Sequence, residues 1–154
     1  MFHEMRRKDR LLSEEEAMAI LEKGEYGVLS TIGEDGWPYG VPISYACRDN
    51  CIYFHMAEGV GHKLENIAHN SRACFTVVGD TLVIPEKFGT LYESVVAFGE
   101  VRPVEDKLES IEILRQKYSP AFEAEGKAYA QRAQAGFAVY CLHIEHITGK
   151  ARRK

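Results

Sequence analysis

The sequence predicts a mainly β domain in which one antiparallel sheet curls into a closed or nearly closed barrel. About six runs rich in β-forming residues are joined by short connections with turn chemistry. Helical segments are inserted among these runs and do not alternate with them, and closure removes the exposed edges of such a sheet. A Rossmann fold is disfavoured because no G-x-G-x-x-G follows a strand. The length of 154 residues suits a single domain, residues 1–154.

Composition and charge exclude several classes of function. The 19 basic and 23 acidic side chains leave a net charge of −4, which disfavours bulk nucleic-acid binding. No apolar run approaches the ~20 residues that span a bilayer, and the N-terminal MFHEMRRKDR lacks the apolar core of a signal peptide. We therefore expect a cytoplasmic protein with neither a nucleic-acid partner nor a membrane partner. Its four cysteines, none in a C-x-x-C pair, are expected to be free thiols.

A short amphipathic helix is the first predicted element. Ser13 and Glu16 have the spacing of a capping box, and Gly24 follows at the end of the helix. The apolar stripe consists of Ala17, Ile20 and Leu21.

Three strands are predicted next, arranged as a meander. Residues 26–32 (YGVLSTI) form the first, GEDGWP has the composition of a hairpin turn, and residues 39–47 return as the second. Residues 51–56 form the third. Pro42 cannot donate a ladder hydrogen bond, so it favours an edge strand, a bulge or a backbone left free for a ligand.

The stretch 52–67, IYFHMAEGVGHKLENI, is the strongest candidate for a site. A strand passes through a glycine-bearing loop into a helix over 62–69. Gly59 and Gly61 let the main chain approach a ligand, and His62 and Lys63 follow at the helix start, where unpaired N–H groups favour an anion. An ordinary strand-to-helix turn with a solvated lysine is the alternative.

The second half of the chain predicts two further strands, a helical pair and a final strand. Residues 73–78 and 95–104 read as strands, Gly99 suggests a bulge, and 79–92 has no clear assignment. Asp106 and Glu109 form a capping pair before a helix whose stripe is Leu108, Ile111 and Leu114. A second helix is expected over 122–135, and the last strand over 137–147 precedes the tail TGKARRK.

Four segments together resemble the FMN-binding split-barrel family of pyridoxamine 5′-phosphate oxidase-like proteins, and most closely its nitroimidazole-resistance (Nim) branch. They are EYGVLSTIGEDGWPYGVPISY, IYFHMAEGVGHKLENI, FTVVGD and HIEHITGKARR. The resemblance covers about residues 5–153, and F-H-x-A followed by G-H-K-L-x-N-I is its most specific part. It implies a six-stranded antiparallel split barrel, FMN as cofactor, and a homodimer with two flavin sites at its interface.

The same resemblance implies a set of cofactor-binding residues: Val41, Pro42, Ile43, Ser44, Phe54, His55, Met56, Gly61, His62, Lys63 and Asn66. Within this set, Gly61, His62 and Lys63 match the phosphate-binding place, and residues 41–44 match the strand whose backbone faces the isoalloxazine ring. His55 is the one candidate for a catalytic role. The alternatives are a structural histidine at His55, a helix-surface amide at Asn66 and an ordinary strand hydroxyl at Ser44.

Other candidates are weaker. Trp37 lies in a turn and suits either the dimer interface or a cover over the flavin. Apolar residues in the strands 95–104 and 137–147 exceed what one barrel interior needs, which favours an interface there. The last strand and its tail carry three further candidates, His143, His146 and Lys150. Their side chains either extend into the partner's site or, as the favoured interpretation, lie at a solvated strand edge.

Neither tails nor metal ligands are expected to form the site. The basic residues near the two ends are most simply mobile tails; the alternative is that either set adds electrostatic attraction for a phosphate-bearing ligand. They are Arg6, Arg7 and Arg10 near one end and Arg152, Arg153 and Lys154 near the other. A zinc site of Cys47, Cys51 and His55 is conceivable but lacks the usual ligand spacing. No Ser-His-Asp or Cys-His catalytic set is visible.

The resemblance implies an FMN-dependent oxidoreductase that reduces nitroaromatic or related small molecules. The alternative from another class is a flavin- or haem-binding carrier or sensor without turnover, because the superfamily also contains haem-handling and deazaflavin-binding members. A vitamin B6 oxidase proper is disfavoured, because the C-terminal segment does not resemble that of the true oxidases.

Overall fold

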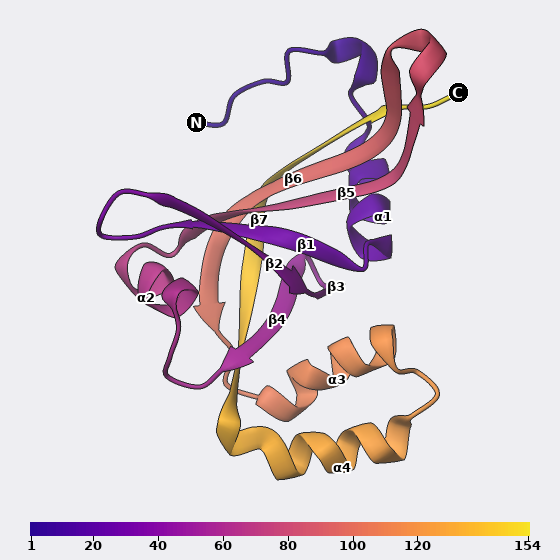
Figure 1. Cartoon of the computed structure of the whole chain (residues 1–154). Helices are drawn as coiled ribbons and strands as arrows, with labels where there is room; N and C mark the ends of the chain where they lie inside the picture. The colour runs from indigo at the N-terminus through magenta and orange to yellow at the C-terminus, as the bar shows by residue number, and fades with distance from the viewer.

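The computed structural model describes all 154 residues and contains one curled antiparallel sheet of seven strands in the order β2-β1-β5-β6-β7-β4-β3 (Figure 1). The strands are β1 (Tyr26–Ile32), β2 (Pro38–Ser44), β3 (Ala46–Arg48), β4 (Cys51–Ala57), β5 (Arg72–Ile84), β6 (Gly89–Pro103) and β7 (Phe137–Arg152). The helices are α1 (Glu14–Lys23), α2 (His62–His69), α3 (Lys107–Tyr118) and α4 (Glu123–Ala133), with the 3-10 turns Lys8–Arg10, Pro85–Lys87 and Gln134–Gly136. The predicted mainly β antiparallel split barrel is confirmed.

The sheet has seven strands instead of six because the run 39–47 breaks at Tyr45 into β2 and β3. These two strands lie at opposite edges of the sheet, so the predicted three-strand meander is wrong. The chain passes from one edge to the other through Tyr45 alone, and this brings the two edges of the curled sheet together. Pro42 lies in the edge strand β2, as one of its predicted roles requires.

Tyr45 forms the corner of the barrel because its ring turns into the core, where it is fully buried. Its hydroxyl donates to the carbonyl of Leu21 in α1, and its backbone N–H donates to the hydroxyl of Tyr118 at 2.9 Å. Lys117 donates to the Tyr45 carbonyl at 2.9 Å and lies 3.9 Å above the ring centroid. Sheet, α1 and α3 therefore meet at one residue.

Residues 79–92, left unassigned above, belong to a long β5–β6 hairpin that extends past the barrel (Figure 1). The hairpin turns through Pro85–Lys87, and Phe88 adopts a left-handed conformation (φ 49°) with an almost fully exposed side chain. Val83 is also exposed. Without one buried face, this segment lacks the alternation of polar and apolar residues by which strands are predicted.

The expected mobile C-terminal tail is wrong for Arg152 and Arg153. β7 continues to Arg152, which pairs with Tyr92 of β6. The guanidinium group of Arg153 lies 2.9 Å from the nearly buried carboxylate of Glu93 and 3.3 Å from Glu16 of α1. Ion pairing and ladder hydrogen bonds thus hold this basic segment against the barrel.

The helices confirm both capping predictions and the stripe of α1, whereas Leu108 and Ile111 of the α3 stripe are half-buried and line a cleft. Both halves of the capping box of Ser13 and Glu16 form, and the stripe of α1 is buried. Asp106 caps α3, accepting from the N–H of Glu109 at 3.0 Å, and Leu114 is buried. α3 and α4 form a hairpin beneath the barrel (Figure 1). None of the helices combines the length and apolar character needed to cross a bilayer.

Candidate functional site

The junction between β4 and α2 has the glycine geometry expected of a ligand-binding loop. Gly59 and Gly61 have φ values of 70° and 119°, which residues with a side chain rarely adopt. A Cβ at either position would meet no atom within 4 Å, so the space outside the loop is open. Gly61 is the N-cap of α2 and no side chain caps the helix. The first N–H groups of α2 therefore remain without a side-chain acceptor.

His62 and Lys63 begin α2 but face different surroundings. The His62 ring stacks on Tyr39 of the edge strand β2, with ring centroids 3.9 Å apart. Lys63 is half-buried, and its charge acts on His55 of β4. Partial burial, and secondly the positive charge of Lys63, lower the pKa of His55. The His55 imidazole is therefore neutral at pH 7 and able both to donate and to accept a hydrogen bond.

A cleft of about 1350 Å³ lies between the barrel and the α3–α4 hairpin. Ser44 of β2 and His55 of β4 line its barrel side, and Phe137 lies edge-on to the His55 ring with centroids 6.3 Å apart. The helical side carries Leu108, Tyr118, Phe122 and Tyr129. Mixed apolar and polar walls of this size suit a flat organic ligand. The helical wall is not predictable from the sequence, because an apolar stripe does not show which surface of the barrel a helix faces.

Several residues of the predicted set face the core. Phe54 and Met56 are buried, and Val41 and Ile43 pack against the core, so none of these four side chains lines the cleft. Their strands instead keep unpaired backbone edges. β2 pairs only with β1, and residues 54–57 of β4 pair only with β7. Pro42 and Ser44 occupy the outward face of β2.

Asn66 is buried, and its amide nitrogen donates to the hydroxyl of Thr31 at 3.0 Å. The alternative of a helix-surface amide is therefore wrong, since this bond ties α2 to β1. Beside it lies a smaller hollow of about 470 Å³ whose rim carries Glu34, Asp35 and Glu65. These carboxylates repel an anion, and the predicted site residue His62 lines the same hollow, together with His69.

The conceivable zinc set of Cys47, Cys51 and His55 is wrong. Cys47 lies opposite Ile52 and packs against the core, whereas Cys51 projects from the outer face of the sheet. His55 lies four residues from Cys51, about 13 Å along an extended strand. Cys51 instead meets Cys141 and His143 of β7. His143 is exposed to solvent as predicted, but it does not lie at a strand edge, because β7 is an interior strand.

Comparison with known proteins identifies the family. A family model described as pyridoxamine 5′-phosphate oxidase matches residues 13–151. No curated protein matched the sequence. Solved structures with the same fold include a candidate 5-nitroimidazole antibiotic resistance protein from Bacteroides thetaiotaomicron, with a TM-score of 0.75 and 19% identity over 97% of this chain and 96% of that one.

Two further structures share the fold. An FAD-binding protein from Mesorhizobium loti has a TM-score of 0.69 and 23% identity over 94% of this chain and 97% of its own. An FAD- and haem-binding protein from Mycobacterium smegmatis has a TM-score of 0.79 and 21% identity over 92% of this chain and 72% of its own. At these identities the likeness concerns the fold, whereas the family match spans nearly the whole chain: the chain belongs to the pyridoxamine 5′-phosphate oxidase family.

Proposed function

We propose that this protein binds FMN and reduces nitroaromatic or related small molecules, as an oxidoreductase of the Nim type. The observation that carries the proposal is the uncapped glycine start of α2, with Lys63 beside it and the cleft of Ser44 and His55 next to it. Family membership and the shared fold with the candidate nitroimidazole resistance protein support it.

The residues present fit a flavin with a terminal phosphate. The free N–H groups of the first turn of α2 and the Lys63 ammonium are donors for a phosphate dianion. The unpaired backbone edge of β2 offers donors and acceptors to the polar rim of a ring, and neutral His55 offers one of each. Bound FMN, once reduced by an electron donor, would supply the electrons for reduction of a nitro group. The chain's part is to orient the ring, exclude water and hold His55 neutral.

A single-turnover experiment tests the activity without knowledge of the natural electron donor. FMN-loaded protein is photoreduced without oxygen and mixed with a 5-nitroimidazole, and the return of oxidised flavin absorbance is followed. We expect reoxidation faster than that of free reduced FMN at equal concentration, together with loss of nitro absorbance. Equal rates for bound and free flavin would contradict a reductase.

The second candidate function is a flavin- or haem-binding carrier or sensor without turnover. The shared fold with the FAD- and haem-binding protein of Mycobacterium smegmatis favours it. The absorption spectrum of the purified protein, read before and after addition of haem, separates the two cases. A Soret band in place of a flavin spectrum would support the carrier and count against the reductase.

FMN should bind more tightly than FAD. The anion site at Gly61 and Lys63 suits a terminal phosphate, and no second motif for an adenylate is visible. Titration of the flavin-free protein with both cofactors, followed by quenching of flavin fluorescence, measures the two dissociation constants. An FAD constant equal to or below that of FMN would contradict this assignment of the phosphate site.

Substitution of Lys63 by alanine should weaken FMN binding about ten- to a hundredfold, because a charge-assisted contact contributes roughly 1.5–3 kcal/mol. Lys87→Ala is the matched control, since it removes the same charge from the exposed tip of the β5–β6 hairpin. Thermal unfolding of both variants should remain close to that of the parent. Unchanged affinity with lowered stability in Lys63→Ala would show that Lys63 is structural.

We also propose that the protein is a homodimer and that FMN binding stabilises it. The exposed aromatic side chains of Trp37 and Phe88 are available to a partner. The interface expected on strands 95–104 and 137–147 needs revision, because their inward-facing residues fill the protomer's own core and only outward residues are available. Sedimentation of flavin-free and FMN-loaded protein at low micromolar concentration is the test. A monomer holding FMN with undiminished affinity would rule out a shared site.

A further inference from the structure

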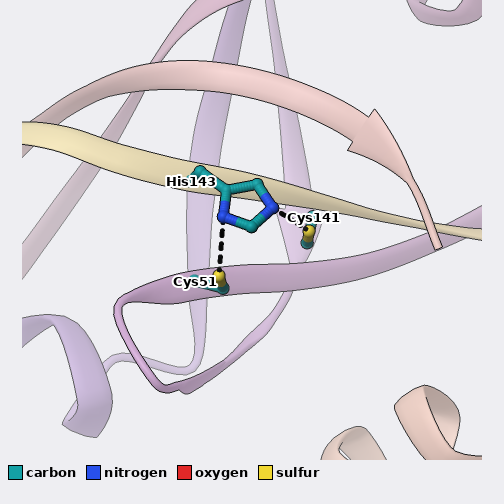
Figure 2. Close-up of side chains that lie close together, drawn as sticks. All are labelled: Cys51, Cys141 and His143. Carbon is teal, nitrogen blue, oxygen red and sulfur yellow. Dashed lines mark hydrogen bonds between the residues drawn. The ribbon is translucent and has the colours of Figure 1, made fainter.

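Cys51, Cys141 and His143 form a compact cluster on the outer face of the barrel (Figure 2). Cys51 of β4 lies directly opposite His143 of β7, and Cys141 is two residues away on β7, so all three side chains project from the same face. The Cys51 sulfur lies 3.2 Å from Nδ1 of His143, and the Cys141 sulfur lies 3.3 Å from Nε2. All three ligand atoms lie within 4.8 Å of one another.

We propose that these three side chains bind one Zn²⁺ ion. Two sulfurs and an imidazole nitrogen are the donors that zinc prefers, and three protein ligands leave a fourth position for water. That position lies toward solvent, because both cysteines are buried whereas His143 is exposed. The proposed site is separate from the flavin cleft, whose lining includes none of the three residues.

Either sulfur, taken with its own ring nitrogen, already has the separation of two ligands of a tetrahedral ion. Zinc bonds of about 2.3 Å to sulfur and about 2.0–2.1 Å to nitrogen put neighbouring ligand atoms roughly 3.5 Å apart, close to the observed sulfur–nitrogen separations. The metal-free arrangement puts one sulfur at each ring nitrogen. Binding therefore requires one thiol to turn about its Cα–Cβ bond until both sulfurs face the same nitrogen. Both thiols release their protons to the solvent on binding, which leaves the oxidation states unchanged.

A bound ion would join two strands at a weak place in the sheet. β3 is only three residues long and pairs only with β4, so the register of β4 on β7 holds this edge of the barrel. Zinc would tie β4 to β7 at Cys51, beside the corner where β3 turns into β4. A ligand that binds the folded protein more tightly than the unfolded chain stabilises the folded protein, so zinc should raise the midpoint of thermal unfolding.

The experiment is a competition between the reduced protein and a chromophoric zinc chelator, followed by absorbance. The variants Cys51→Ser, Cys141→Ser and His143→Asn each remove one proposed ligand. Cys74→Ser and His146→Asn are matched controls, since they change the same residue types on β5 and β7 outside the cluster. Circular dichroism of each variant verifies folding. Co²⁺ is added to the parent protein as a second probe that needs no substitution.

We expect one zinc ion per chain, binding at least about tenfold weaker in each of the three ligand variants, and unchanged binding in both controls. The Co²⁺ complex should show sulfur-to-cobalt charge transfer in the near ultraviolet and the visible bands of a tetrahedral ion. Zinc should raise the unfolding midpoint of the parent and of the controls only. Absence of stoichiometric binding, equal affinity in the ligand variants, or a Co²⁺ spectrum without the sulfur band would overturn the proposal.

Discussion

Replacement of Tyr45 by alanine should lower the free energy of unfolding by about 3–5 kcal/mol, the range for removal of a large buried aromatic side chain. The Tyr45 ring is fully buried and packs against the Phe75 ring, with the two ring centroids 4.8 Å apart. The Lys117 ammonium nitrogen lies 3.9 Å from the centroid of the Tyr45 ring. Its loss would open a cavity at the one residue that joins the two edges of the sheet. Urea unfolding followed by circular dichroism measures the change.

Tyr45→Phe separates packing from hydrogen bonding in this prediction. Phenylalanine keeps the ring but leaves the carbonyl of Leu21 without its donor, so the expected loss is about 1–3 kcal/mol. Burial raises the pKa of Tyr45, so the hydroxyl is a donor across the ordinary pH range. An alanine variant no less stable than the phenylalanine variant would show that the ring does not support the corner.

Gly99→Ala should lower the free energy of unfolding by about 1–3 kcal/mol, the usual cost of overpacking. Gly99 lies at the register shift between β6 and β7, which confirms the predicted bulge. A Cβ there would overlap the carbonyl oxygen of His143 and lie 2.8 Å from its carbonyl carbon. Because the obstacle is backbone, a rotamer change cannot relieve it, and the β6–β7 pairing must shift. Urea unfolding measures the change.

Gly79→Ala is the matched control for Gly99→Ala. Gly79 also lies in a strand beside a register shift, but a Cβ there meets no atom within 4 Å and its φ is not positive. The control should retain the stability of the parent within about 0.5 kcal/mol. Equal losses in the two variants would show that the close approach to the His143 carbonyl is not the reason for the glycine, because the change in unfolded-state entropy alone favours alanine.

The helices and strands that can be predicted from the sequence are those with one buried face and one solvent-exposed face. The capping box at Ser13 and the apolar stripe of α1 are local sequence patterns, and in the structure the residues of the stripe are buried. The β5–β6 hairpin beyond Val78 is exposed to water around most of its length, so periodicity gives no signal there. The corner at Tyr45 was missed for another reason. A continuous run of β-forming residues does not reveal that its two halves pair at opposite edges of the sheet.

The candidate site also has one part that the sequence predicts and another part that depends on strand pairing. Gly61 and Lys63 are adjacent in the chain, so a local motif is enough to bring them together. The alternation along β4 puts Phe54 and Met56 on the core face and His55 on the opposite face, which is a pattern that the sequence itself carries. The meeting of Cys51 with His143 depends on the pairing of β4 with β7. Sequence spacing cannot supply that pairing, because the two residues are 92 positions apart.

The position of β7 also sets the order in which a newly made chain can complete its barrel. β7 follows the other six strands of the sheet in the sequence, yet it lies inside the sheet between β6 and β4. Until residues 137–143 leave the ribosome, the β3–β4 hairpin has no neighbour to join it to β5 and β6. Until then, the edge of β4 that pairs with β7 stays open. Unpaired edges of this kind pair readily with other chains, so the β4 edge is where the unfinished barrel is most open to aggregation.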